Sequence, residues 1–165
     1  MHWADEAACT ATAQAMARRP ALREAFIELH GTLGSGKTTF VRHLLQALGV
    51  QGRIKSPTYA VMESYEVPGL PIWHFDFYRF KDPQEFEDAG FRDVFAGAGL
   101  KLAEWPELAA GLLPVPDLRM ELTPLEGDQR RVTFEACTPR GLDLLPDAGQ
   151  HPAVAGINRL EGRAP

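Results

Sequence analysis

The chain has little of several features that mark familiar classes of protein. Among its 165 residues there are only two cysteines, Cys9 and Cys137, and neither lies in a C-x-x-C pair. We therefore expect reduced, inert thiols, with no disulfide framework and no structural zinc. There is also no uninterrupted apolar stretch long enough to cross a bilayer. The first ten residues, MHWADEAACT, carry neither a basic start nor an apolar run, so we expect a cytoplasmic protein with no signal peptide and no membrane contact.

Positive charge is scarce as well. There are 17 lysines and arginines against 22 acids, which gives a net charge of -5. Proteins that hold nucleic acid by bulk electrostatics neutralise its phosphates with lysine and arginine. This excess of acid argues against a DNA-binding protein, and any contact with RNA must be local or shared with a partner.

What the chain does have is enough apolar sequence for one compact domain. Hydrophobic residues make up 45% of the composition, which suffices for a real core at this length. Strand-like and helix-like segments alternate without an internal repeat, which is typical of an α/β fold. Beyond Pro139 the composition shifts to proline, glycine and alanine. We therefore expect a single domain over residues 1–138 and a loosely ordered tail over 139–165.

Periodicity and capping signals give the expected elements. Strands are expected within 25–30, 59–67, 71–80 and 100–105, helices within 5–19, 40–48, 82–90 and 106–113, and a closing hairpin in 117–125 and 129–137.

One motif stands between the first expected strand and a helix. Residues 31–38, GTLGSGKT, fit the phosphate-loop pattern G-x-x-x-x-G-K-[ST]. Glycines let backbone N–H groups curl around phosphate oxygens, and the helix start adds about half a positive charge. We expect Lys37 to reach the β- and γ-phosphates as a catalytic cation and Thr38 to bind Mg²⁺. The ATP-binding residues expected here are Gly31, Leu33, Gly34, Ser35, Gly36, Lys37, Thr38 and Thr39.

Two acids are expected to serve the metal. A phosphate loop needs a carboxylate near the magnesium, usually at the carboxyl end of a nearby strand. Asp76 and Glu104 both lie in apolar strand-like segments, so we expect both to be catalytic and to hold Mg²⁺ together with Thr38. Two alternatives stay open: Asp76 pairs only with Arg79, or Glu104 is a helix-start acid ahead of the proline that follows Trp105.

Three further residues have alternatives of comparable weight. Thr58, in KSPTY, either returns to the γ-phosphate, as in P-loop switch proteins, or belongs to a simple turn. Trp105 either covers the nucleotide or belongs to the core. His74 is expected to pack in or beside its strand rather than to take part in chemistry, because the sequence shows no partner for it.

Four segments in this order resemble the TsaE (YjeE) family of small bacterial P-loop ATPases, which are needed to make threonylcarbamoyladenosine beside the anticodon of tRNAs. The segments are GTLGSGKTTFVRHLLQALG, KSPTY, HFDFYR and EWPE, and the resemblance covers 5–137. The phosphate loop is shared by many NTPases, whereas the other three motifs together are specific to this family.

The resemblance implies a P-loop NTPase-like three-layer domain with a mixed sheet, ATP and Mg²⁺ as cofactors, and weak ATPase activity alone. It implies work with the partner proteins TsaB and TsaD. We expect tRNA to be reached indirectly through their complex and hydrolysis to reset that complex between rounds. It ties Thr38 and Glu104 to the metal and makes Asp76 necessary for activity. It also places the first helix and a late-strand arginine near the adenine, for which Glu6 and Arg131 are the matching residues.

Two positions depart from the family pattern. Thr32 stands where the family usually has an acid, and Cys9 stands where a threonine is common. Neither change removes a phosphate or metal ligand, so the expected ATP site is kept.

Other functions fit less of the sequence. A small-molecule or nucleoside kinase also uses a phosphate loop and a strand acid, but no arginine-rich lid is visible here. A GTP switch would need the guanine-reading tetrapeptide N-K-x-D, which the chain lacks. An adaptor whose ATP only gates binding overlaps the TsaE assignment and stays open.

Overall fold

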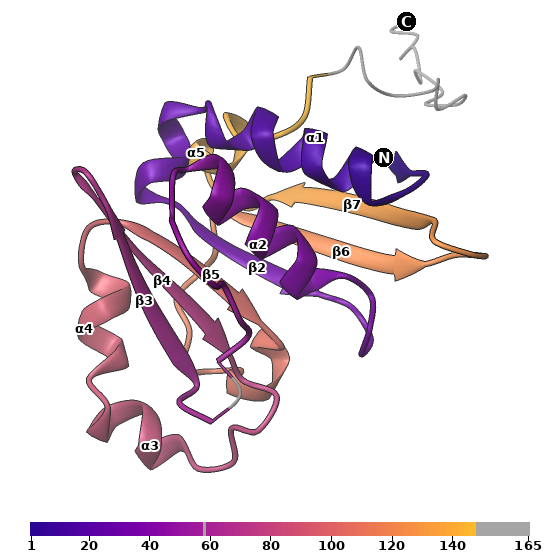
Figure 1. The fold of residues 1–165 in the computed structure, drawn as a ribbon. Helices are drawn as coiled ribbons and strands as arrows, with labels where there is room; N and C mark the ends of the chain where they lie inside the picture. The colour runs from indigo at the N-terminus through magenta and orange to yellow at the C-terminus, as the bar shows by residue number, and fades with distance from the viewer. Residues whose placement is uncertain (58, 148–165) are drawn as a thin grey trace, which may run out of the picture.

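A single seven-stranded sheet organises the computed structural model, which describes residues 1–57 and 59–147 (Figure 1). The strands are β1 His2–Trp3, β2 Phe26–His30, β3 Met62–Val67, β4 Leu70–Asp76, β5 Leu100–Glu104, β6 Leu118–Pro124 and β7 Arg130–Ala136. The helices are α1 Glu6–Ala17, α2 Lys37–Ala47, α3 Pro83–Asp88, α4 Phe91–Ala96 and α5 Pro139–Leu142, with 3₁₀ turns η1 Pro20–Glu24 and η2 Pro106–Ala109.

The order of the strands is β1-β7-β6-β2-β5-β4-β3. The central strands β6, β2, β5 and β4 are parallel to their neighbours in this group, while β1, β7 and β3 pair antiparallel at the two sides. The expected α/β class with a mixed sheet and a closing β6–β7 hairpin is confirmed. Because parallel strands end at the same edge, the carboxyl ends of β2, β4 and β5 lie together, and the loops that follow them form one crevice.

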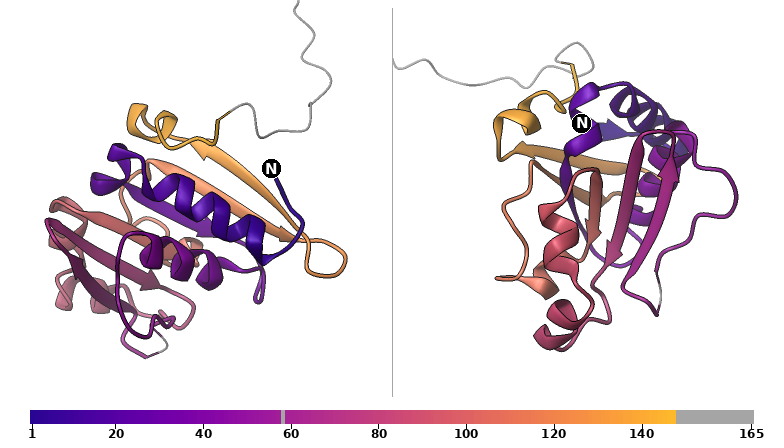
Figure 2. Two further views of the ribbon diagram at one scale, coloured as in Figure 1. Left: turned by 45° about the horizontal axis from the view of Figure 1, so that its top comes forward. Right: turned by 90° about the vertical axis from the view of Figure 1, so that its left-hand side faces the viewer.

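Helices cover both faces of the sheet (Figure 2). On one face, α1 and α2 pack over an aliphatic core that includes Leu29, Leu44 and Ile72. On the other face, α3 and α4 pack over a cluster rich in phenylalanine, where Phe75 contacts Phe91 edge to face at 5.1 Å. Successive side chains along a strand point to opposite faces of the sheet, so residues two apart pack on the same face.

Local sequence signals explain most helix ends. The Asp5 side chain caps α1 by accepting from the Ala8 N–H at 3.0 Å. Asp82 caps α3, and Pro83 fills its first position, where the missing N–H costs nothing. After α2, Gly49 adopts a φ of +100° and ends the helix.

Several elements differ in extent from the expectation. The strand expected within 59–67 begins only at Met62, because Val61 has a positive φ of +62°. The strand expected within 71–80 stops at Asp76, whose side chain accepts from the N–H of Tyr78 and turns the chain. The helix expected within 106–113 is only the 3₁₀ turn η2. Neither α4 nor the two-residue β1 was anticipated.

The expectation of a loose chain from Pro139 onward is wrong for residues 139–147. Thr138 caps α5 by accepting from the Gly141 N–H at 3.2 Å. A Cβ atom on Gly141 would lie only 1.8 Å from the Asp117 carbonyl oxygen, so α5 packs closely on the sheet. Leu144 follows with 1% exposure. The rest of the expected tail, 148–165, lies outside the described residues.

Within the part of the chain that the structure describes, no helix is long and apolar enough to span a bilayer.

Candidate nucleotide-binding site

The segment between β2 and α2 forms a loop that depends on glycine. Gly31 and Gly36 have φ angles of +141° and +105°, which favour glycine. A Cβ atom on Gly31 would lie 2.5 Å from both the Leu122 carbonyl oxygen and Ser35 Oγ, so a side chain there would force the loop to move. No side chain of a described residue caps α2. The N–H groups at the start of α2 can therefore meet an anion.

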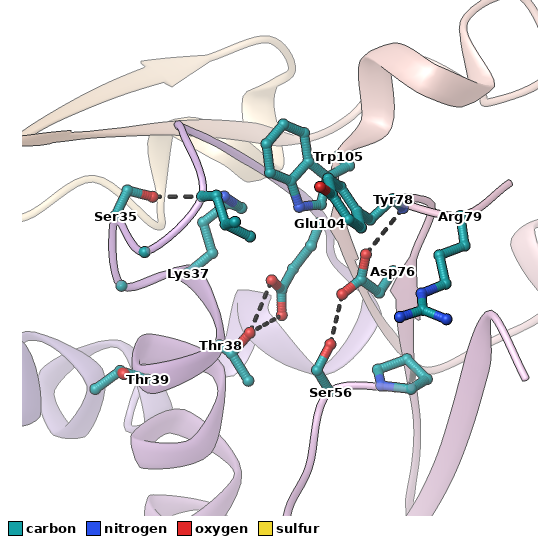
Figure 3. Close-up of a pocket in the computed structure, with 14 residues that line it drawn as sticks. Ser35, Lys37, Thr38, Thr39, Ser56, Asp76, Tyr78, Arg79, Glu104 and Trp105 are labelled. Carbon is teal, nitrogen blue, oxygen red and sulfur yellow. Dashed lines mark hydrogen bonds between the residues drawn. The ribbon is translucent and has the colours of Figure 1, made fainter. Parts of the chain in front are cut away.

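Lys37 is folded into this loop rather than extended into solvent. Its ammonium donates to the carbonyl oxygens of Gly31 at 2.6 Å and Thr32 at 3.0 Å. It also lies 4.2 Å from the ring centroid of Trp105 (Figure 3). The residue is 4% exposed. Burial lowers the pKa of Lys37 below its ordinary value, and the carboxylate of Glu104 opposes that shift. The loop thus holds a desolvated lysine at its centre.

The hydroxyl of Thr38 and the carboxylate of Glu104 meet at the same point. Thr38 Oγ1 lies 2.9 Å from each Glu104 oxygen, which brings the first turn of α2 against the end of β5. Glu104 is 2% exposed, so its carboxylate is fixed in a buried site. This placement agrees with a role beside the loop, and Glu104 does not act as a cap for the turn that follows it.

Asp76 ends β4 directly opposite Glu104 in the parallel β4–β5 register. Asp76 Oδ2 accepts from Ser56 Oγ at 2.5 Å, and Oδ1 accepts from the Tyr78 N–H at 2.9 Å. Among the described residues, Asp76 and Arg79 form no ion pair, so the simple pairing that the sequence left open is not the arrangement found. Ser56 belongs to the segment after α2, which therefore returns to the crevice.

Aromatic side chains cover the crevice from the β4 and β5 side. The backbone of Trp105 adopts a φ of +55°, which turns its indole over Lys37, and the Tyr78 ring lies 5.0 Å from it. The guanidinium of Arg79 lies 5.1 Å from the centroid of the Tyr59 ring. Trp105 packs partly buried against the phenylalanine-rich cluster and also lies over Lys37 at the phosphate loop, and its contact with a nucleotide stays a prediction. Thr58 lies outside the described residues.

Two cavities lie on either side of the phosphate loop. The first, of about 380 Å³, is lined by Leu33, Gly34, Ser35, Gly36, Lys37, Thr38, Thr39, Ser56, Pro57, Asp76, Tyr78, Arg79, Glu104 and Trp105. The second, of about 520 Å³, is lined by Trp3, Asp5, Glu6, Ala7, Cys9, Ser35, Gly36, Thr39, Asp128 and Arg130. We name them the phosphate cavity and the base cavity. Because both include Ser35, Gly36 and Thr39, a nucleotide could span them across the loop.

The base cavity contains Glu6, as the resemblance implied, but the arginine that lines it is Arg130. Arg130 Nε donates to the Ser35 carbonyl oxygen at 2.9 Å, whereas Arg131 is exposed. Strand alternation explains the difference, because Arg130 shares a face with the buried Val132 and Arg131 points to the opposite face. Of the two neighbouring arginines, the structure therefore places Arg130 at this cavity, where the resemblance implied Arg131.

Cys9 also lines the base cavity. Burial raises the pKa of its thiol to about 12, and the carboxylate of Glu6 adds to this shift. The expectation of an inert thiol holds for Cys9, which is 4% exposed. Glu6 Oε1 lies within hydrogen-bonding distance of His43 Nε2, at 2.8 Å.

The oxygen groups of the phosphate cavity suit a hard divalent cation. The Thr38 hydroxyl and the carboxylates of Asp76 and Glu104 face it from three different elements. Mg²⁺ prefers a few oxygen ligands and keeps several waters, and a cavity of about 380 Å³ has room for such a shell beside phosphate oxygens. This donor set therefore fits magnesium.

Sequence reasoning missed three residues of this region. Ser56 lies within the KSPTY motif, from which only Thr58 was chosen as a site residue. Arg130 lies in no recognised motif, and its position two residues before the buried Val132 is the one signal that favours it. His74 was expected to have no partner, yet its Nε2 lies 2.8 Å from Glu104 Oε1. The parallel pairing of β4 with β5 creates that contact, and no local pattern reveals it.

Comparison with known proteins agrees with the motifs. Residues 3–132 match the family described as "Threonylcarbamoyl adenosine biosynthesis protein TsaE". The chain belongs to the TsaE family. The resemblance stated from four short segments is thereby confirmed, and the TsaE family is involved in tRNA threonylcarbamoyladenosine biosynthesis.

Individual TsaE proteins show how far the similarity extends. The tRNA threonylcarbamoyladenosine biosynthesis protein TsaE of Haemophilus influenzae is 41% identical over 119 residues, which cover 72% of this chain and 75% of that protein. The protein of the same name from Bacillus subtilis is 34% identical over 129 residues, covering 78% and 80%. The crystal structure of Bacillus subtilis YdiB matches with a TM-score of 0.69 at 27% identity, covering 87% of this chain and 88% of that one.

Proposed function

We propose that this chain is an ATPase that binds Mg-ATP and supports threonylcarbamoyladenosine formation in tRNA by acting on the TsaB–TsaD pair. One observation carries the proposal. Lys37, Thr38 and Glu104 converge on the glycine loop within hydrogen-bonding distance of one another or of the loop backbone. This is the set of groups that binding and hydrolysis of a nucleoside triphosphate require.

Each group has a definite part in the proposed reaction. Loop N–H groups and Lys37 bind the phosphates, and the Thr38 hydroxyl and the Glu104 carboxylate hold the metal, which neutralises phosphate charge when bound. Asp76 orients the water that attacks the terminal phosphate. Trp105 lies over Lys37 and excludes bulk solvent, which strengthens these electrostatic contacts.

Turnover by the chain alone is expected to be slow. Among the described residues that line the phosphate cavity, only Lys37 and Arg79 are basic, and the Arg79 guanidinium is already stacked on Tyr59. Phosphoryl transfer needs cations near the developing charge, and an arginine supplied by a partner raises such rates about 10³- to 10⁵-fold. An incomplete cation set favours an ATPase that depends on its partners.

The mouth of the phosphate cavity has the character of a docking surface. Leu33 and Tyr78 line this cavity and are 73% and 49% exposed, and Tyr59, stacked on Arg79, is 88% exposed. Exposed aromatic and apolar side chains that gather at one place mark interaction sites. We propose that ATP orders this rim, which then docks on the TsaB–TsaD pair, and that hydrolysis releases it.

The test measures ATP turnover by the purified chain with and without its own TsaB and TsaD. Turnover that rises at least about 10-fold with both partners supports the proposal, since partner-supplied groups act on this scale. Turnover unaffected by the partners contradicts it. Phosphate transfer from ATP to a small hydroxyl compound without the partners would instead identify a kinase.

The Asp76→Ala variant tests whether ATP binding can be separated from the resetting of the TsaB–TsaD pair by hydrolysis. Asp76 is bonded to Ser56 and to the Tyr78 N–H rather than to the phosphate loop, so the variant should keep ATP affinity and lose hydrolysis. We expect it to support one round of threonylcarbamoyl transfer to tRNA but not repeated rounds. The measurement compares product formed with limiting and with excess enzyme. Repeated rounds at the unsubstituted rate would show that hydrolysis does not reset the complex.

A further inference from the structure

His74 is a fully buried polar side chain beside the proposed metal site. It lies on β4 with 0% exposure, two residues before Asp76 at the carboxyl end of the strand. Because side chains two residues apart on a strand point to the same face, His74 lies on the α2 face of the sheet together with Ile72 and Asp76. Its Nε2 lies 2.8 Å from Glu104 Oε1, while its Nδ1 is buried without a hydrogen-bond partner among the described residues.

The hydrogen-bond pattern assigns the proton on this ring. An ionised carboxylate only accepts hydrogen bonds, so Nε2 must carry the proton that Glu104 Oε1 accepts. A second proton on Nδ1 would be a buried donor with nothing to receive it, which is costly. The contact with Glu104 thus places a His74 hydrogen on Nε2.

Glu104 has only two side-chain restraints in the described structure. Thr38 Oγ1 lies 2.9 Å from both of its oxygens, and His74 donates to Oε1 alone. In the proposed function Thr38 is a metal ligand through a lone pair of its oxygen, and its one hydrogen can be donated to only one Glu104 oxygen at a time. The His74 bond adds a second restraint, which holds Oε1 from the β4 side.

We propose that His74 is a positioning residue: it holds the Glu104 carboxylate in the orientation that meets Thr38, and so fixes the metal-binding edge of the site. This inference rests on the proposed function. The unpartnered Nδ1 is consistent with this role. A buried polar atom without a partner costs free energy, so a leucine or phenylalanine would fill the same space at lower cost if packing were the only requirement. Carboxylates that hold metals are commonly oriented by such hydrogen bonds, whose loss costs about 10- to 100-fold in metal affinity.

Two substitutions distinguish positioning from packing. His74→Gln keeps a donor at the same bond separation from Cα as Nε2, whereas His74→Leu fills the space without a donor. The measurement is Mn²⁺ affinity, by electron paramagnetic resonance, with a non-hydrolysable ATP analogue bound. We expect His74→Leu to weaken Mn²⁺ binding about 10-fold and His74→Gln to restore it to within about twofold. Thermal unfolding verifies that each variant is folded.

Each outcome decides the matter. A folded His74→Leu variant with unchanged Mn²⁺ affinity overturns the inference, and so does a His74→Gln variant as weak as the leucine variant. If the unsubstituted chain binds neither the analogue nor Mn²⁺, the proposed function fails instead.

A second measurement serves if the leucine variant does not fold. Nitrogen-15 NMR of the unsubstituted chain reports which ring nitrogen of His74 carries hydrogen, with His74→Gln identifying the signal. We expect the hydrogen on Nε2 both without and with the magnesium-bound analogue. A hydrogen on Nδ1 in the complex would overturn the inference, because the bond to Glu104 would then be absent.

Discussion

The two ends of the proposed nucleotide site are built differently. At the phosphate end, Lys37 and Glu104 are 4% and 2% exposed and are held by short bonds to the loop and to Thr38. At the base end, the Glu6 side chain is 67% exposed, and Arg130 contributes one bond to the Ser35 backbone. The preorganised phosphate end should determine specificity for phosphate and metal, whereas the open base end should contribute modest affinity and adapt to its ligand.

This contrast ranks the expected effects of substitution. Hydrogen bonds to charged groups in buried sites contribute about 1.5–3 kcal/mol each. Exposed ion pairs and hydrogen bonds contribute about 0–1 kcal/mol. Changes at the phosphate end should therefore abolish binding or metal dependence, while changes at the base end should only weaken affinity.

Lys37→Ala should have the largest effect. If the ammonium makes two charge-assisted bonds to phosphate oxygens, its loss weakens ATP binding by about 100-fold or more. Isothermal titration calorimetry measures this, with Lys81→Ala, an exposed lysine outside the cavity, as the control. Unchanged affinity in the Lys37 variant would contradict the phosphate-loop assignment.

The same substitution should leave the fold intact. Burial lowers the pKa of Lys37, so its charged form is less favourable in the folded chain than in the unfolded one. Because the folded pKa lies below the unfolded value, this penalty is present at neutral pH and fades only as the pH rises through the folded pKa. Removing the ammonium removes the penalty but also its bonds to the Gly31 and Thr32 carbonyl oxygens, so the two effects oppose each other. We expect a folded variant with an unfolding temperature close to that of the unsubstituted chain.

Thr38→Ala and Glu104→Gln should have the next largest effect, and it should be confined to magnesium. Each removes one oxygen ligand or its charge without touching the phosphate contacts of the loop. We expect the magnesium concentration for half-maximal ATP binding to rise about 10-fold, with binding in EDTA unchanged. Glu107→Gln, three residues further on and half exposed, is the matched control. An identical magnesium titration in either variant would contradict its role as a ligand.

The residues of the phosphate end could be predicted from the sequence because most of them lie close together along the chain. Gly31, Gly36, Lys37 and Thr38 lie within eight consecutive positions, and the loop's glycines have one physical use in that spacing. Asp76 and Glu104 could be added because acids at the ends of apolar strands are rare. For the same reason the strand, loop and helix order, and with it the α/β class, followed from periodicity.

The base end could not be predicted because it depends on register and distant pairing. Whether Arg130 or Arg131 faces α1 is decided by which residue of β7 lies under the helix, and both are equally plausible by composition. The contact of His74 with Glu104 likewise needs the β4–β5 pairing. The packing of α5 depends on Asp117, more than twenty residues earlier, which accepts from Thr138 at 2.5 Å.

Arg130→Ala and Arg131→Ala test the base end with the smallest expected effect. Arg130 Nε donates to the Ser35 carbonyl oxygen across the boundary between the two cavities. Its loss removes a positive charge beside the nucleotide and one restraint on the loop, which together should weaken ATP binding about threefold to tenfold.

Arg131 is the internal control for this experiment because it is chemically identical, adjacent in sequence and on the opposite face of β7. We expect its alanine variant to bind ATP within about 1.5-fold of the unsubstituted chain, since a screened surface charge contributes little at that distance. Titration calorimetry at low and high salt measures both variants, and the difference between them should persist at high salt because the Arg130 contact is partly buried. If Arg131→Ala weakens binding and Arg130→Ala does not, the β7 register is shifted by one residue, and the base cavity must be redrawn around the other arginine.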